Sequence, residues 1–192
     1  ENIKEHLLDN THKEKLEKIY TELIEKHLTK TFHLFPESLK TPLITFGGYA
    51  GKNLNIYDSE NPITALSQLD SFPNPKIKQL NQWKGISNFL LTSTGEFRKR
   101  VDRNLGFPVD NKDIKNDFKI YLESLTGLKP LLKALNKIKL LPDPCFSDYE
   151  WKILRSTLRL LPELDFQLKS LLQENKLSDF SEISLAALKS FG

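Results

Sequence analysis

Apolar residues recur every three or four positions in segment after segment of this 192-residue chain, which is the spacing of one face of an α-helix. No segment shows sustained two-residue alternation with β-branched residues, the pattern of a half-buried strand, and no internal repeat is visible. A chain of this length can bury one good core. We therefore predict an all-α fold, an irregular multi-helix bundle of about six to eight helices, forming a single helical region over residues 1–192.

The expected helices are separated by proline, glycine or capping residues. They cover residues 4–29, 62–73, 76–90, 112–125, 129–141, 148–171 and 180–192. Ser147 with Glu150, and Asp179 with Glu182, form capping boxes that begin the last two helices. The second box explains the carboxylate pair of Asp179 and Glu182 without acid–base chemistry. We expect Pro162 to kink or interrupt the long helix. Residues 31–60 lose the helical period and gain prolines and glycines, so we expect loop or short broken structure there.

Composition says more about the cellular compartment of this chain than about its function. The net charge of +3 is too small to indicate nucleic acid by itself. No apolar stretch is long enough for a membrane span and the first residues do not resemble a signal peptide, so we expect a cytoplasmic protein with no membrane partner. The single cysteine, Cys145, fits a reducing compartment and is expected to be buried. The chain contains no methionine, and we expect it to be a fragment of a longer protein.

The candidate motifs for cofactor or metal binding lack residues that the chemistry requires. Residues 46–53 approach a phosphate-binding loop, but Phe46 replaces the first glycine and Asn53 replaces the Ser or Thr that would bind Mg²⁺. The four histidines form neither an HExxH motif nor a pair at i,i+4. We therefore expect no catalytic, cofactor-binding or metal-binding residue, and no enzymatic activity of this chain alone.

Two stretches resemble signature runs of one protein family. Trp83, residues 90–100 and Gly106-Phe107-Pro108 resemble the Leu-Leu-Thr-x-x-Gly-x-x-Arg-Lys … Gly-Phe-Pro run of UvrD/RecB-like superfamily 1 DNA helicases, which include the exonuclease V type. Residues 179–183 (Asp-Phe-Ser-Glu-Ile) with 185–188 (Leu-Ala-Ala-Leu) are similar to the segment that precedes the Walker B carboxylates in that family. Residues 160–162 (Leu-Leu-Pro) match the helix leading into it, and all three occur in the family's order.

The resemblance implies that residues 80–192 are the helical 1B insertion of the first motor domain and its return towards the motor, and that residues 1–79 are the variable helical start of the insertion. The parent chain would be an ATP-dependent DNA helicase or helicase–nuclease acting in DNA repair or recombination. ATP and Mg²⁺ would bind outside this fragment, which itself needs no cofactor. Its implied partners are DNA, the rest of the motor and a companion subunit.

The segment after residue 90 is rich in basic and small hydroxyl residues, which suit contact with a phosphate backbone without reading its sequence. The predicted DNA-binding residues are Thr92, Thr94, Arg98, Lys99, Arg100 and Arg103. Phe97 either stacks on an exposed base or anchors the loop to the core.

Two helix faces are weaker candidates for DNA binding. One carries Lys129, Lys133 and Lys137 at four-residue spacing, and the other carries Lys152, Arg155 and Arg159. Like charges at this spacing repel, and a polyanion would relieve the repulsion, although a solvated face explains them too. The alternative function is a helical protein–protein interaction module that docks a partner subunit.

Overall fold

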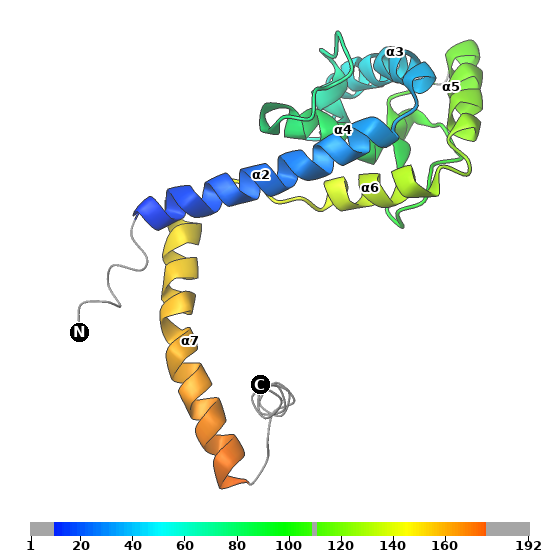
Figure 1. Ribbon diagram of the computed structural model, residues 1–192. Helices are drawn as coiled ribbons and strands as arrows, with labels where there is room; N and C mark the ends of the chain where they lie inside the picture. The colour runs from blue at the N-terminus through cyan, green and yellow to red at the C-terminus, as the bar shows by residue number, and fades with distance from the viewer. Residues whose placement is uncertain (1–9, 109–110, 176–192) are drawn as a thin grey trace. The chain divides into compact units, whose positions relative to one another are not determined.

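The computed structural model describes residues 10–108 and 111–175, and it confirms the all-α prediction (Figure 1). The α-helices are α2 (Asn10–Leu34), α3 (Glu37–Leu54), α4 (Leu80–Leu90), α5 (Lys112–Ser124), α6 (Lys129–Lys139) and α7 (Asp148–Glu174). Short 3₁₀ helices are η1 (Pro62–Leu66), η2 (Ile77–Gln79) and η3 (Arg103–Leu105). The capping box predicted at Asp179 and Glu182 lies outside the described residues.

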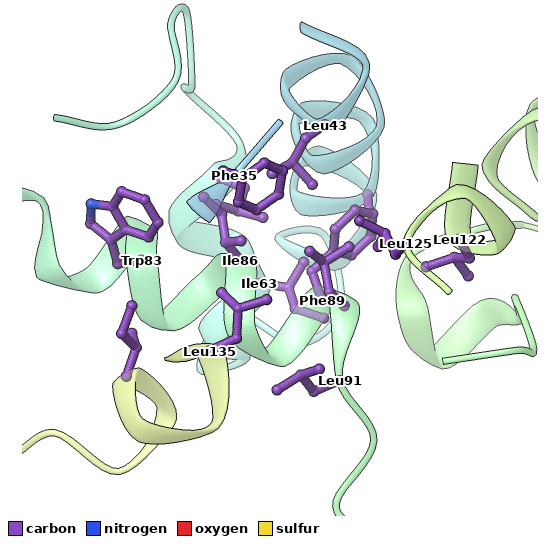
Figure 2. Close-up of a cluster of buried hydrophobic side chains, with 14 of the residues drawn as sticks. Phe35, Leu43, Ile63, Trp83, Ile86, Phe89, Leu91, Leu122, Leu125 and Leu135 are labelled. Atoms are coloured by element: carbon purple, nitrogen blue, oxygen red, sulfur yellow. The ribbon is translucent and has the colours of Figure 1, made fainter. Parts of the chain in front are cut away.

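The chain divides into two units, one of residues Leu16–Pro144 and the other of Glu1–Lys15 with Cys145–Gly192. The Leu16–Pro144 unit is built around α4, whose apolar stripe is buried as its spacing predicts. Trp83, Ile86 and Phe89 are inaccessible to solvent, and Figure 2 shows them among Leu43, Ile63 and other apolar side chains. Helix α4 contacts η1, η2 and α6, so several elements of the unit pack on it.

An aromatic stack joins α4 to α5 through the loop between them. The ring of Phe118 lies 4.6 Å from that of Phe89 and 5.0 Å from that of Phe107, with interplanar angles of 19° and 12°. Stacked rings at this separation gain about 0.5–1.5 kcal/mol beyond their burial. The stack therefore fixes where α5 lies relative to α4.

The prediction of broken structure over residues 31–60 is wrong, because α3 covers most of this segment. Its glycines are close-packing positions: a Cβ on Gly51 would lie 2.7 Å from the backbone nitrogen of Ser67, and a Cβ on Gly47 would lie 3.1 Å from the Leu66 side chain. Both neighbours lie in or directly after η1. The helix tolerates glycine because tertiary contact with η1 outweighs the low helix propensity.

Local signals mark the ends of some helices, although the helices differ in length from those that the sequence predicts. Asn61 caps η1 by accepting from the Ile63 backbone N–H (3.1 Å), but η1 is a 3₁₀ helix that ends at Leu66. Gly127, with φ of 95°, lies just after the end of α5 and closes the turn there, which is a common role of glycine after a helix. In α2, the apolar residues Ile19, Tyr20 and Leu23 are exposed and Leu16 is half-buried, while the buried face runs through Ile24 and Leu28.

In the other unit, the predicted capping box begins α7: Ser147 Oγ accepts from the Glu150 N–H (3.2 Å), and the Glu150 carboxylate accepts from the Ser147 N–H (2.8 Å). The helix runs on through Pro162 to Glu174, so of the two predicted effects of this proline, a kink or an interruption, the interruption does not occur. Cys145 is exposed, which corrects the prediction that it is buried. In the described part of the chain, no helix is both long enough and apolar enough to cross a membrane.

Candidate nucleic-acid interface

The basic loop after α4 is a tight turn that returns the chain to the core. Leu91 and Phe97 form an isolated antiparallel bridge, and the Arg98 N–H donates to the Leu90 carbonyl (2.9 Å). Gly95 sits at the turn with φ of 82°, a conformation that favours glycine. The loop therefore has a defined shape, and Phe97 packs against the core while still lining a surface cavity.

The two predicted hydroxyl donors are used within this turn. Thr92 Oγ1 accepts from the Glu96 N–H (3.1 Å) and lies 2.9 Å from Thr94 Oγ1. These contacts replace part of the backbone pairing that a helix or strand would supply. The first contribution of Thr92 and Thr94 is thus to hold the shape of the loop.

Arg98 points towards the body of the protein. Its Nε and Nη2 donate to the carbonyl oxygen of Asn88 at 3.3 and 3.1 Å. Burial lowers the pKa of Arg98, and the nearby Asp102 carboxylate acts in the opposite direction. Arg98 is therefore a half-buried link between the loop and α4 rather than a freely exposed cation.

The other predicted loop cations are exposed: Lys99, Arg100 and Arg103. The guanidinium of Arg103 lies 5.5 Å from the centre of the Tyr57 ring, and the Tyr57 hydroxyl donates to the Arg103 carbonyl (2.7 Å). These contacts hold Arg103 on the surface near the end of α3. Lys99 and Arg100 project into solvent and keep their charge available.

A surface groove with a volume of about 520 Å³ lies between the loop, α5 and the start of α6. Its lining residues are Glu96, Phe97, Arg98, Lys99, Lys119, Leu122, Glu123, Thr126, Gly127, Leu128, Lys129 and Leu132. Apolar side chains from all three segments contribute to its surface, and four cations and two carboxylates accompany them. A volume of this size suits a small planar group or a short segment of a larger ligand.

Helix α6 holds the loop in place beside this groove. The side-chain amide of Asn136 donates to the Gly95 carbonyl (2.7 Å), and the Lys139 ammonium donates to the Thr92 carbonyl (3.1 Å). A Cβ on Gly95 would lie 2.5 Å from the Asn136 amide oxygen, so this approach requires glycine. The loop and α6 therefore form one surface of defined geometry.

The structure brings together some predicted residues and adds others. Arg98 and Lys99 meet Lys129 at the groove, whereas Lys133 and Lys137 continue along the exposed face of α6. Lys119 is a groove cation that the sequence did not single out, because nothing in its local pattern marks α5 as a neighbour of the loop. Lys152, Arg155 and Arg159 line a separate hollow on α7.

Within residues 10–108 and 111–175, no three His, Cys, Asp or Glu residues are grouped in a way that could hold a metal ion. No family model, no curated protein and no solved structure matches this chain.

Proposed function

We propose that the Leu16–Pro144 unit binds single-stranded nucleic acid through the groove and its basic surroundings, without sequence specificity. The observation that carries the proposal is the convergence of Lys99, Lys119 and Lys129 from three separate segments around one cavity with apolar walls. Cations neutralise a phosphate backbone, and apolar or aromatic walls accept the face of an unstacked base. Both groups that a single strand exposes would thus find complementary surface.

The charge of the groove supports an anionic ligand. Four cations line it against the carboxylates of Glu96 and Glu123, so the local balance is positive. Beyond the groove, α6 continues the positive surface with Lys133 and Lys137, both exposed. A single strand that entered the groove could follow this face.

The wider setting of this proposal follows from the sequence resemblance described above. In that setting the chain is the 1B region of an ATP-dependent DNA helicase or helicase–nuclease, working in the cytoplasm in DNA repair or recombination. The motor, with its ATP and Mg²⁺, would lie elsewhere in the parent chain. Binding without sequence specificity suits a motor that must move along any strand.

The charge half of the proposal is tested by fluorescence anisotropy with a labelled single strand, measured at several salt concentrations. Lys99→Ala combined with Lys129→Ala should weaken binding and reduce the slope of log affinity against log salt by about 0.7 for each lost phosphate contact. The matched control is Lys26→Ala with Lys52→Ala, which removes the same charge from exposed positions on α2 and α3. Absence of binding at low salt, or an equal loss in both pairs, would count against the interface.

The groove itself is tested by filling it. Thr126 is exposed and lines the groove, so Thr126→Trp should occupy the cavity without disturbing the core. Thr29→Trp, on the exposed surface of α2, is the control. We expect Thr126→Trp alone to reduce affinity for a single strand, with little effect on an abasic strand of the same length, which offers phosphates but no bases.

A second candidate function is docking of a partner subunit. It is favoured by the exposed apolar side chains of α7, such as Leu161, Leu164 and Leu168, each at least half exposed. A protein partner would be captured in stoichiometric amount, and its affinity would change little with salt concentration because the contact is apolar. If the full chain binds such a partner and shows no affinity for nucleic acid at low salt, this second function replaces the first.

A further inference from the structure

A positively charged hollow of about 540 Å³ lies on the first half of α7. Its lining residues are Asp148, Trp151, Lys152, Arg155, Ser156 and Arg159. Their spacing of three and four positions places them on one face of the helix. The one acidic member, Asp148, accepts from the ammonium of Lys13 at 3.2 Å, so the three cations of the hollow are not balanced from within it.

Two residues that line this hollow each carry a buried hydrogen-bond donor that has no partner among the residues that the structure describes. Trp151 is 7% exposed, and within residues 10–108 and 111–175 its indole Nε1 donates to no acceptor. The Nε of Arg155 is likewise buried and unpaired. The other tryptophan, Trp83, shows the usual arrangement, because its Nε1 donates to the Asn74 carbonyl at 3.0 Å.

Buried donors without partners are rare, because each loses its hydrogen bonds to water and gains none in the folded protein. Here both belong to residues that line the same hollow, and the hollow is also where the cations of α7 gather. A bound acceptor with negative charge would satisfy the two donors and relieve the repulsion among the cations. Local packing alone gives no reason for an indole N–H and a guanidinium N–H to remain unpaired on one cationic helix face.

We propose that this face of α7 binds a phosphate group. The indole N–H of Trp151 and the Nε–H of Arg155 donate to its oxygens, and Lys152 and Arg159 supply further positive charge. Phosphate fits better than a single carboxylate because it presents several acceptor oxygens and up to two negative charges to three cations. The site requires only the phosphate group, whether free, at the end of a strand or within a backbone, and is therefore independent of the groove.

Proton–nitrogen correlation spectra of the full chain test the site directly, because its two tryptophans give separate indole N–H signals. Inorganic phosphate is added at constant ionic strength, with chloride as the replaced ion. We expect the Trp151 signal to shift and saturate, while the Trp83 signal stays in place. Trp151→Phe assigns the signal, and circular dichroism checks that each variant keeps its helix content.

Arg155→Lys keeps the charge and removes the buried Nε donor, so it should weaken phosphate binding about tenfold. An unmoved Trp151 signal, or a shift without saturation that Arg155→Lys leaves unchanged, would overturn the proposal. Oligonucleotides with and without a 5′-phosphate then identify the source: a shift with both indicates backbone phosphate, and a shift with only the first indicates a terminal phosphate. The Lys99→Ala, Lys129→Ala variant should retain the shift, which separates this site from the groove.

Discussion

Replacing Arg98 by alanine should destabilise the Leu16–Pro144 unit, although Arg98 lies in a loop and the sequence predicts it to bind DNA. Its guanidinium donates twice to the carbonyl of Asn88, which lies in the last turn of α4. The last four carbonyls of an α-helix have no partner within the helix, and the helix dipole makes this end negative. Arg98 therefore caps the C-terminal end of α4.

The expected magnitude follows from this geometry. A hydrogen bond to a charged group contributes about 1.5–3 kcal/mol net, and a cation at a helix C-terminus about 0.3–1 kcal/mol. The two effects share the same atoms and do not add in full, so we expect Arg98→Ala to cost about 2–3 kcal/mol. For a unit of this size the melting temperature should fall by roughly 8–12 °C. Arg98→Lys keeps the charge without the paired donors and should lie between.

Urea unfolding followed by fluorescence measures this effect. In a Trp151→Phe background, Trp83 is the remaining tryptophan and reports on the core of the Leu16–Pro144 unit. Arg100→Ala is the control, since an exposed arginine without such contacts should change stability by less than about 0.5 kcal/mol. Equal unfolding midpoints for Arg98→Ala and Arg100→Ala would refute the capping argument.

Three further predictions concern packing and pH. Gly106→Ala should cost at least about 2 kcal/mol in urea unfolding, because φ is 86° and the new Cβ would overlap the Ala50 carbonyl; Gly127→Ala, at φ 95° in open space, should cost only about 1 kcal/mol. Phe118→Ala should cost about 3–5 kcal/mol and abolish the aromatic stack. The pKa of Glu25 is lowered, first by the backbone N–H that begins η2 and then by Lys76. Its stabilisation is present above the ordinary pKa and lost as pH falls through the lower folded value, and Glu25→Gln should remove that acid-side loss in unfolding measured against pH.

The elements that the sequence predicts well are those with local signals. The capping box of Ser147 and Glu150 marks the start of α7 because both partners lie within one turn. Gly127 marks the boundary between α5 and α6 in the same way. Each of these signals acts through contacts between residues a few positions apart, so no tertiary information is needed.

Helix α3 shows why the remaining elements could not be predicted. Gly47 and Gly51 lower helix propensity, and local reasoning therefore favours a loop. Their value appears only when η1 packs against them at distances that a Cβ would prevent. The four-residue spacing of Gly47 and Gly51 indicates that one face of a helix could pack closely against a neighbour. It does not identify the element that packs there.

Only part of the candidate interface can be predicted from the sequence, because the rest depends on tertiary packing. The sequence places Arg98, Lys99, Arg100 and Arg103 in one cationic loop, but the turn directs Arg98 inward and Arg103 towards Tyr57. The groove depends on α5 and α6 lying beside the loop, which is a tertiary property. Lys119 joins the site only through that arrangement.

The α6 face offers a test that separates nucleic-acid binding from folding. Lys133 lies between Lys129 and Lys137, one turn from each, so Lys133→Glu converts two repulsive i,i+4 pairs into attractive ones. The helix should gain a few tenths of a kcal/mol per pair. If the α6 face follows a phosphate backbone, affinity for a single strand should nevertheless fall and the salt slope should decrease by about 0.7. A loss of binding in a variant whose unfolding midpoint is unchanged or higher cannot arise from misfolding, whereas unchanged affinity would restrict the interface to the groove and leave the lysine face simply solvated.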